Sequence, residues 1–503
     1  MLFGRKKKDS RVAFEEILLD SSNLPSFNRG RMEGRMELPI SVRNIIVVAI
    51  IFILIAFWFF SKIFTLQILE GQEYYDISEN NSIDETTIIA ERGVIYDRNG
   101  ELLAWNEPDK NEEYSFPVRA YTDRKGMGQL IGYVSYPLKD KRGFYYRTEY
   151  IGRNGVEASY NDLLGGENGE QLIETNALGD VIGAHVVDVP TPGSELTLSV
   201  DAKLSEAMYD IIATSTAQSG SRSGAAAIMN IHTGEIVGLA SFPSYDPEVM
   251  ADGDDVALIE QYNNDDRFPF LNKVLAGAYT PGSIVKPFVA YAALVEGIIS
   301  SHKTIVSTGE LVIPNPYNPG NPSVFRDWRA HGKMNMKEAI AYSSNVYFYT
   351  IGGGYGDQEG LGISKMYQYF SRFGFGTTTG INLANEQTGT VPNPAWKKEL
   401  FDDDWRLGDT YFTAIGQYGW QVTPLQMLVA YGALGNGGKL FVPHIEKGKM
   451  GRYRQIELEK WAVDIVQEGM LMTTNYPGGT ARSLEKPYIR IAAKSGTAEL
   501  DFS

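Results

Sequence analysis

Residues 279–288 read YTPGSIVKPF, and this stretch decides the fold because it joins a turn to an apolar helix. A serine at the start of a helix projects into a cleft, where backbone N–H groups favour developing negative charge. Lys286 follows Ser283 by three residues and so shares its helix face. The pattern predicts a nucleophilic serine whose proton is taken by a lysine that burial and other cations keep neutral. The pattern Ser-x-x-Lys also occurs at 300–303 and 483–486, so one match has little weight. Taken alone, Ser283 and Lys286 could equally be a helix cap and a surface lysine.

A second motif, Ser343-Ser344-Asn345, lies sixty residues beyond Ser283. We expect Ser343 to relay the serine proton and Asn345 to bind an amide of the substrate. Ser-x-Asn also occurs at 21–23 and 78–80, so this motif has no weight by itself.

A third motif, Lys494-Ser495-Gly496-Thr497, comes near the end of the sequence. We expect this segment to bind substrate: Lys494 supplies positive charge for a carboxylate, and Ser495 and Thr497 supply hydroxyl donors from an edge strand. An exposed lysine that protects an edge strand is the alternative. The three motifs in this order favour the catalytic interpretation.

An unbroken apolar run, IIVVAIIFILIAFWFF, occupies residues 45–60. A helix that continues through Leu69 is long enough to cross a bilayer, and Lys62 can snorkel to the interface. Nine Lys/Arg and six Asp/Glu precede the run within residues 1–44. The positive-inside rule therefore predicts a single-pass plasma (inner) membrane protein with a cytoplasmic N-terminus and an extracytoplasmic catalytic domain.

Composition excludes several classes of function. The 503 residues include no cysteine, which rules out disulfides, thiolate metal sites and a cysteine nucleophile. The formal net charge of −16 argues against a nucleic-acid partner, which needs a basic face. We expect no cofactor and no metal.

Four regions are expected. Residues 1–44 are a basic tail, 45–69 a transmembrane helix, 70–200 a β-rich pedestal, and 201–503 an α+β domain whose antiparallel sheet is flanked by helices. In the pedestal, Asn99-Gly100 predicts one hairpin turn, and residues 169–188 predict a second hairpin.

The last region should begin with a strand and a helix from about Ala202, followed by a hairpin that turns at Thr233-Gly234. A final strand is expected at 488–498. The expected helices between them are 287–296, 336–349, 363–373, 423–434 and 462–472.

With these motifs in this order, the chain resembles class B penicillin-binding proteins, and within them the elongation-type, or type 2, group. The resemblance covers nearly everything after the span. Besides the three motifs it rests on ERG at 91–93, DRNG at 97–100, GRNGVE at 152–157, DW at 327–328, HG at 331–332, VYFY at 346–349, GDT at 408–410, IGQ at 415–417 and TPLQM at 423–427.

The resemblance implies a D,D-transpeptidase that cross-links peptidoglycan during cell-wall elongation and shape maintenance. A stem pentapeptide would acylate Ser283 through its D-Ala-D-Ala end, D-alanine would leave, and an amine of a neighbouring stem would attack. β-Lactams would acylate the same serine, and the backbone N–H groups of Ser283 and Thr497 would form the oxyanion hole. The implied partners are a SEDS-family membrane glycosyltransferase and elongation-complex proteins.

Three departures from the family pattern stand out. Only about ten residues separate Trp105-Asn106 from Phe116, which predicts a reduced outer part of the pedestal. Some relatives bind zinc with a cysteine ligand, which this chain lacks. The sequence stops nine residues after Lys494, so the transpeptidase domain is expected to be incomplete at its C-terminus.

Three other functions remain open at this point. A β-lactamase uses the same constellation, although the anchor and pedestal argue against it. A division-type transpeptidase is closer, and the GDT and HG segments favour elongation over division. A third alternative is a non-catalytic scaffold that activates a glycan polymerase. Such a scaffold need not retain every residue of the site, so the presence of the full set argues against it: Ser283, Lys286, Ser343, Asn345 and Lys494.

Overall fold

The structure is a computed structural model that describes residues 41–72, 83–110, 114–141, 145–175, 181–315, 318 and 320–499. It divides into two units, one of residues 1–83 with 175–180 and one of residues 84–174 with 181–503.

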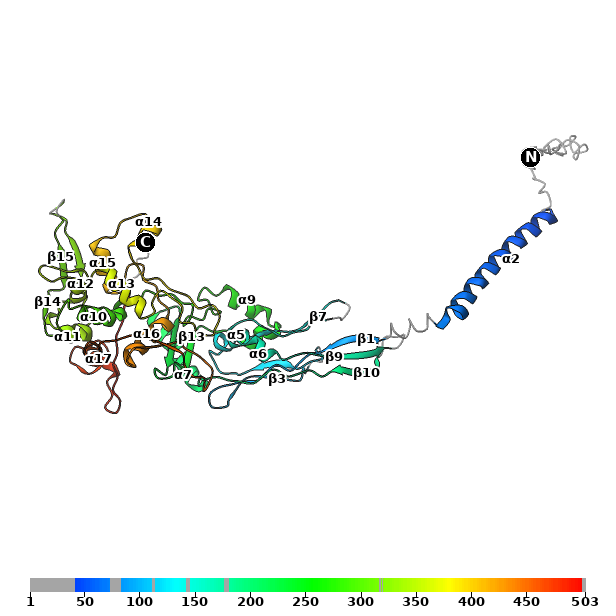
Figure 1. The fold of residues 1–503 in the computed structure, drawn as a ribbon, viewed down its shortest axis with the longest axis horizontal. Coiled ribbons are helices and arrows are strands. Elements are labelled where there is room, and N and C mark those ends of the chain that lie inside the picture. Colours follow the sequence, from blue (N-terminus) through cyan, green and yellow to red (C-terminus); the bar gives the residue numbers. More distant parts are fainter. Residues whose placement is uncertain are drawn as a thin grey trace, which may run out of the picture. The chain divides into compact units, whose positions relative to one another are not determined.

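The first unit contains the apolar helix (Figure 1). Helix α2 spans Val42–Phe64 and continues as the π-helical turn η3, Thr65–Leu69. Together they form one stretch, Val42–Leu69, that is long and apolar enough to cross a membrane. Lys62 lies in the last turn of α2. This confirms the predicted helix and its continuation to Leu69.

The pedestal contains two main sheets. One has the strand order β1-β9-β10, and the other has the order β11-β2-β3-β4. The strands are β1 Ile83–Ile88, β2 Ile95–Tyr96, β3 Leu102–Glu107, β4 Val118–Tyr121, β9 Gly169–Thr175, β10 Val181–Asp188 and β11 Leu196–Thr197. Two short pairs are β5 Val134–Ser135 with β8 Ile151–Gly152, and β6 Leu138–Lys139 with β7 Tyr145–Arg147.

Both predicted pedestal hairpins are present. Strands β2 and β3 pair antiparallel, with Ile95 opposite Ala104. The turn between them is closed by the Asp97 carboxylate, which accepts the backbone N–H groups of Asn99 and Glu101 at 2.7 and 2.9 Å. Gly100 has a φ of +84°, which glycine adopts without strain. Strands β9 and β10 are neighbours in their sheet, and the centre of their turn lies outside the described residues.

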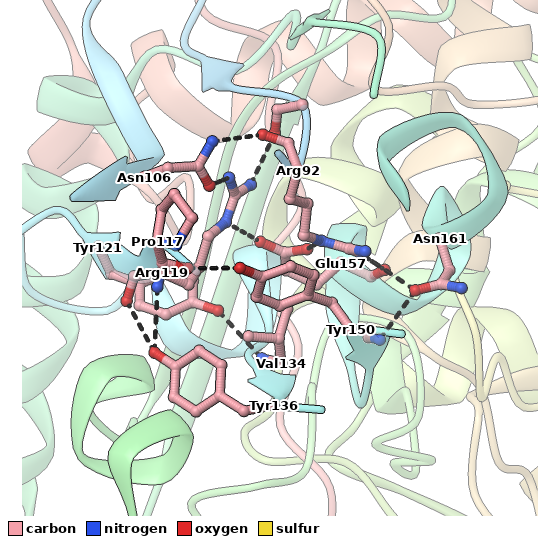
Figure 2. Close-up of polar contacts among 12 residues, drawn as sticks. Arg92, Asn106, Pro117, Arg119, Tyr121, Val134, Tyr136, Tyr150, Glu157 and Asn161 are labelled. Carbon is pink, nitrogen blue, oxygen red and sulfur yellow. Dashed lines mark hydrogen bonds and ion pairs between the residues drawn. The ribbon is translucent and has the colours of Figure 1, made fainter. Parts of the chain in front are cut away.

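A buried ion triad joins the segments of the pedestal (Figure 2). Glu157, on the short helix α5 (Gly155–Ser159), accepts from Arg92 Nε at 2.6 Å and from Arg119 Nε at 2.8 Å. All three side chains have 0% exposure. The guanidinium groups also donate to Asn161, Asn106 and the Gly93 carbonyl, so β3, β4, α5 and the segment after β1 meet at one carboxylate.

We expect Glu157→Gln to destabilise the folded protein by about 3–5 kcal/mol, because it leaves two buried guanidinium groups without a counter-charge. Urea unfolding of the purified full chain measures this. Glu170→Gln, at an exposed position, is the matched control. An unfolding curve for Glu157→Gln that overlays the control would show that the triad does not stabilise the pedestal.

The second half of the chain begins as expected. Strand β11 leads to helix α7 (Ala202–Ser219), whose first turn is capped by the Asp201 carboxylate on Leu204 N–H at 2.9 Å. Strands β12 (Gly224–Met229) and β13 (Ile236–Phe242) then pair antiparallel around Gly234. Helix α7 packs on this hairpin, and so does α16 (Pro424–Gly435), which starts with a capping box between Thr423 and Gln426.

Helices form most of the remaining domain. The segments are α8 Pro247–Asp252, α9 Val256–Asn264, α10 Lys286–Val295, α11 Met336–Tyr342, α12 Asn345–Gly353, α13 Ile363–Arg372, α14 Pro394–Phe401, α15 Leu407–Ala414 and α17 Lys460–Asn475. Short antiparallel strand pairs accompany them: β14 Ile305–Ser307 with β17 Gly332–Met334, β15 Glu310–Ile313 with β16 Ser323–Arg326, and β18 Lys439–Phe441 with β19 Tyr453–Gln455.

Helix α10 lies at the centre of the largest apolar core. All its residues except Val295 are buried, and it packs against α11, α12, α13 and α17. The Phe288 ring contacts Phe373, Phe375 and Tyr431 with centroids 4.9–5.2 Å apart. Burying each such ring contributes roughly 1.5–3 kcal/mol, so the helix start that bears the first motif is held rigidly.

The predicted final strand at 488–498 is wrong. Within the described residues these positions form no ladder, apart from one bridge between Lys486 and Ile489. The backbone there bonds to a helix instead of to a neighbouring strand. Ala493 N–H donates to the Met470 carbonyl of α17 at 3.0 Å.

Candidate active site

Ser283 lies in a 3-10 turn, η4 (Gly282–Val285), that runs directly into α10. Gly282 has a φ of +57°, and a Cβ there would lie 2.2 Å from the Thr497 carbonyl oxygen. Only glycine therefore lets the turn lie against the third motif. Gly282 N–H donates to the Gly416 carbonyl at 2.9 Å, which ties the turn to the segment after α15.

Lys286 is fully buried at the first position of α10. Its Nζ donates to the Ser343 carbonyl at 2.8 Å and to Asn345 Oδ1 at 2.7 Å, and lies 3.4 Å from Ser343 Oγ. Burial and the nearby charge of Lys494 lower its pKa well below the ordinary value, against the attraction of Asp327. Such a lysine can be neutral near neutral pH and can accept a proton.

The second motif forms a sharp turn between two helices, whereas the sequence predicted one helix over 336–349. Helix α11 ends at Tyr342, and Ser343 adopts the left-handed conformation with a φ of +59°. Ser344 caps α12, with its hydroxyl accepting Tyr347 N–H at 3.3 Å. Serine and asparagine favour caps over helix interiors, and the cap and the contacts of the turn fix the break at Ser343. The break presents Ser343 and Asn345 to Lys286.

Lys494 reaches the same turn from the other side. Its Nζ donates to Ser343 Oγ at 2.8 Å and to the Ser495 carbonyl at 2.7 Å. Burial lowers its pKa to about 7. Ser495 Oγ shares a 2.6 Å hydrogen bond with Thr480 Oγ1, and a Cβ at Gly496 would lie 2.8 Å from Ile284 Cγ2. The third motif is thus packed against the turn that bears Ser283.

The three sequence motifs therefore meet at the Ser343 hydroxyl, between the two lysine amines. Ser343 Oγ accepts from Lys494 and lies within reach of Lys286. Both lysines have lowered pKa values, so either amine can take part in proton transfer through the Ser343 hydroxyl. The other two Ser-x-x-Lys segments lack the burial that lowers the pKa of Lys286. Their serines and lysines are all exposed: Ser300, Lys303, Ser483 and Lys486.

Some residues of the site had no predicted role. Tyr431 donates its hydroxyl to the Ile284 carbonyl at 2.6 Å and so braces the turn of Ser283. Gly416 contacts Gly282, since a Cβ there would lie 2.1 Å from its carbonyl oxygen. Asp327 contacts Ser344 at 2.6 Å. Asp327 and Gly416 belong to the DW and IGQ segments of the family resemblance. The spacing of residues along the sequence does not show that they contact Ser344 and Gly282.

A metal site does not emerge from the residues that the structure describes. Among them, no group of three or more His, Asp or Glu side chains is arranged to hold an ion.

Comparison with known proteins gives two family matches and a relative that spans most of the chain. Residues 224–501 match the penicillin binding protein transpeptidase domain, and residues 114–198 match the penicillin-binding protein dimerisation domain. The chain is 30% identical to the peptidoglycan D,D-transpeptidase MrdA of Escherichia coli strain K12, over 92% of this chain and 85% of that protein.

Solved structures agree. A complex between the penicillin-binding protein PBP2 and MreC from Helicobacter pylori contains a chain that superimposes with a TM-score of 0.70 at 26% identity, covering 84% of this chain and 90% of that one. A second match, described as structural coordination of polymerization and crosslinking by a peptidoglycan synthase complex, has a TM-score of 0.69 at 26% identity, covering 92% and 90%. The chain belongs to the penicillin-binding protein transpeptidase family and is a peptidoglycan D,D-transpeptidase of the elongation type.

Proposed function

We propose that Ser283 Oγ is the nucleophile of this transpeptidase. It attacks the carbonyl carbon of the penultimate D-alanine of a stem pentapeptide, and the peptide bond to the terminal D-alanine breaks. The released D-alanine takes the proton that Ser283 gave up. An amine from a neighbouring stem then attacks the ester carbonyl and forms the cross-link, the bond to Ser283 Oγ breaks, and a proton from the amine goes to Ser283 Oγ. The observation that carries the proposal is the convergence of Lys286 and Lys494 on Ser343, beside the turn of Ser283.

Each remaining site residue has a role in this proposal. Lys286 is the base for acylation, and Ser343 relays the proton towards the leaving amine. Asn345 binds a substrate amide, and Lys494 binds the terminal carboxylate. The segment 495–497 holds the substrate backbone, and the N–H groups of Ser283 and Thr497 stabilise the oxyanion. β-Lactams acylate the same serine.

Incubation of the purified full chain with a pentapeptide donor and an amine acceptor tests this assignment. We expect D-alanine release together with a cross-linked product, and a penicillin acyl-enzyme that persists. Rapid turnover of penicillin would favour a β-lactamase. Loss of both products, with polymerase stimulation retained, would favour a scaffold.

We also propose that residues 1–44 lie in the cytoplasm and that everything after Leu69 lies outside. The nine basic residues before the span and the acidic remainder support this orientation. The proposed pedestal, 70–200, and transpeptidase domain, 201–503, would then both face the wall. Protease added to intact spheroplasts should digest these two domains and spare the N-terminal tail. The reverse protection pattern would contradict the orientation.

The partner that we propose is a SEDS-family membrane glycosyltransferase, contacted through the span and the pedestal. One structural relative is in complex with MreC, and another belongs to a peptidoglycan synthase complex that coordinates polymerization and crosslinking, which supports partners among the proteins of the elongation complex. Residues 45–60 of the span are uniformly apolar, so this part of the helix can pack laterally against other helices.

A replacement experiment tests this partnership. The full chain should co-purify with its native polymerase. Exchange of the span and residues 70–200 for an unrelated anchor should abolish both association and polymerase stimulation. Retention of both would show that neither the span nor the pedestal couples the two enzymes.

A further inference from the structure

Asp327 is a buried carboxylate beneath the active site. It follows strand β16, and its side chain has 0% exposure. Oδ2 accepts from Ser344 Oγ at 2.6 Å, from Val346 N–H at 3.0 Å and from Ser307 Oγ at 3.3 Å. Oδ1 lies 3.5 Å from Nε2 of His331, whose side chain is also fully buried. One carboxylate therefore contacts both residues that flank Asn345.

The turn that Asp327 contacts is one that the chain does not adopt readily. Ser343 has a φ of +59° and a ψ of +37°, a conformation that costs a non-glycine residue free energy. Three contacts of the active site depend on this turn, because Lys286 donates to the Ser343 carbonyl and to Asn345, and Lys494 donates to Ser343 Oγ. A second contact from the end of β16 supports it, since the Arg326 carbonyl accepts from Asn345 Nδ2 at 3.4 Å.

We propose that Asp327 is a positioning residue for acylation, whose carboxylate holds Ser344 and the first turn of α12 so that Ser343 and Asn345 face Lys286. Asp327 itself touches no reacting atom. The inference rests on the proposed roles of Ser283 and Ser343. It adds an anchor that the three motifs do not contain and that acts through the Ser344 hydroxyl.

Electrostatics support an ionised carboxylate at this position. Burial would raise the pKa of Asp327, but His331, the Ser344 hydroxyl and the backbone N–H groups at the start of α12 outweigh it and hold the pKa below the usual range. The same charge attracts the ammonium form of Lys286 and raises its pKa, whereas burial and Lys494 lower it. Removing the charge should therefore lower the pKa of Lys286 further.

The test compares Asp327→Asn, Ser344→Ala and the double variant in the full chain. Asp357→Asn, at an exposed position, is the matched control. Acylation by a fluorescent penicillin gives a limiting rate and a half-saturating concentration for each variant, at several pH values. We expect Asp327→Asn to lower the limiting rate by about 100-fold, as small misplacements of catalytic groups do, with little change in half-saturation.

Two further results are expected. The double variant should lose much less than the sum of the two single variants, because both substitutions act on the same contact between Asp327 and Ser344. The acidic limb of the pH profile of Asp327→Asn should move to lower pH, since Lys286 must be neutral to act. A general loss of order in the active site would instead lower the acylation rate at every pH and leave the position of the limb unchanged.

The proposal is overturned if folded Asp327→Asn is acylated at the wild-type rate, or if the two substitutions add. Should Asp327→Asn fail to fold, Ser344→Ala decides alone, and a wild-type limiting rate for that variant would overturn the proposal. Failure of the wild-type chain to label at all would instead refute the proposed function.

Discussion

Replacing Ser283 by alanine is expected to abolish covalent labelling by a fluorescent penicillin. The substitution removes Oγ, the only atom at this position that can form the ester. The fold should persist, because the turn is held by Gly282 against Gly416 and Thr497 rather than by the Ser283 side chain. Labelled protein resolved on a denaturing gel measures the loss, and circular dichroism verifies that the variant is folded.

The sequence offers a matched control for this prediction. Ser300→Ala changes a serine that also stands three residues before a lysine but is exposed. It should label as the wild type does. Persistent labelling of folded Ser283→Ala would mean that another residue carries the acyl group.

Replacing Lys286 by alanine should lower the acylation rate by about 10²–10⁴-fold, the range for loss of a general base. Burial and Lys494 lower the pKa of Lys286, so that the wild-type amine can take the Ser283 proton at neutral pH. For the same reason, wild-type acylation should fall as the pH decreases through that pKa. Stopped-flow or quenched measurements of penicillin acylation give the rates.

Two further variants distinguish a role of Lys286 as a base from a role of its positive charge. Lys286→Arg keeps a cation but cannot release its proton near neutral pH, so it should be as slow as Lys286→Ala. Lys303→Ala, at an exposed position, should behave as the wild type. A near-normal rate for folded Lys286→Ala would assign the base to another group, and recovery by arginine would assign Lys286 an electrostatic role.

Local sequence predicted most of the elements that position the site. Asn99-Gly100 and Thr233-Gly234 gave correct hairpin turns, and the apolar periodicity after Lys286 gave α10 almost to the residue. These features succeed because a turn type or a helix face is encoded within a few neighbouring residues.

Other features depend on residues far apart in the sequence. The break between α11 and α12 arises where Ser344 meets Asp327, seventeen positions earlier, so helix periodicity over 336–349 could not show it. A strand at 488–498 needs a ladder partner, and here the backbone contacts α17. The convergence of Lys286 and Lys494 on Ser343 likewise joins segments that are 57 and 151 residues apart. Only the order of the motifs pointed to it.

The central claim is that Ser283 is the acylated nucleophile, and mass-spectrometric mapping of the penicillin adduct on the wild-type full chain tests it most directly. Fragment ions must resolve Ser283 from Ser300, which lies nearby in the sequence. We predict a single adduct on Ser283, present after brief exposure. An adduct on Ser300 or Ser483, with Ser283 unmodified, would contradict the assignment and with it the proposed mechanism.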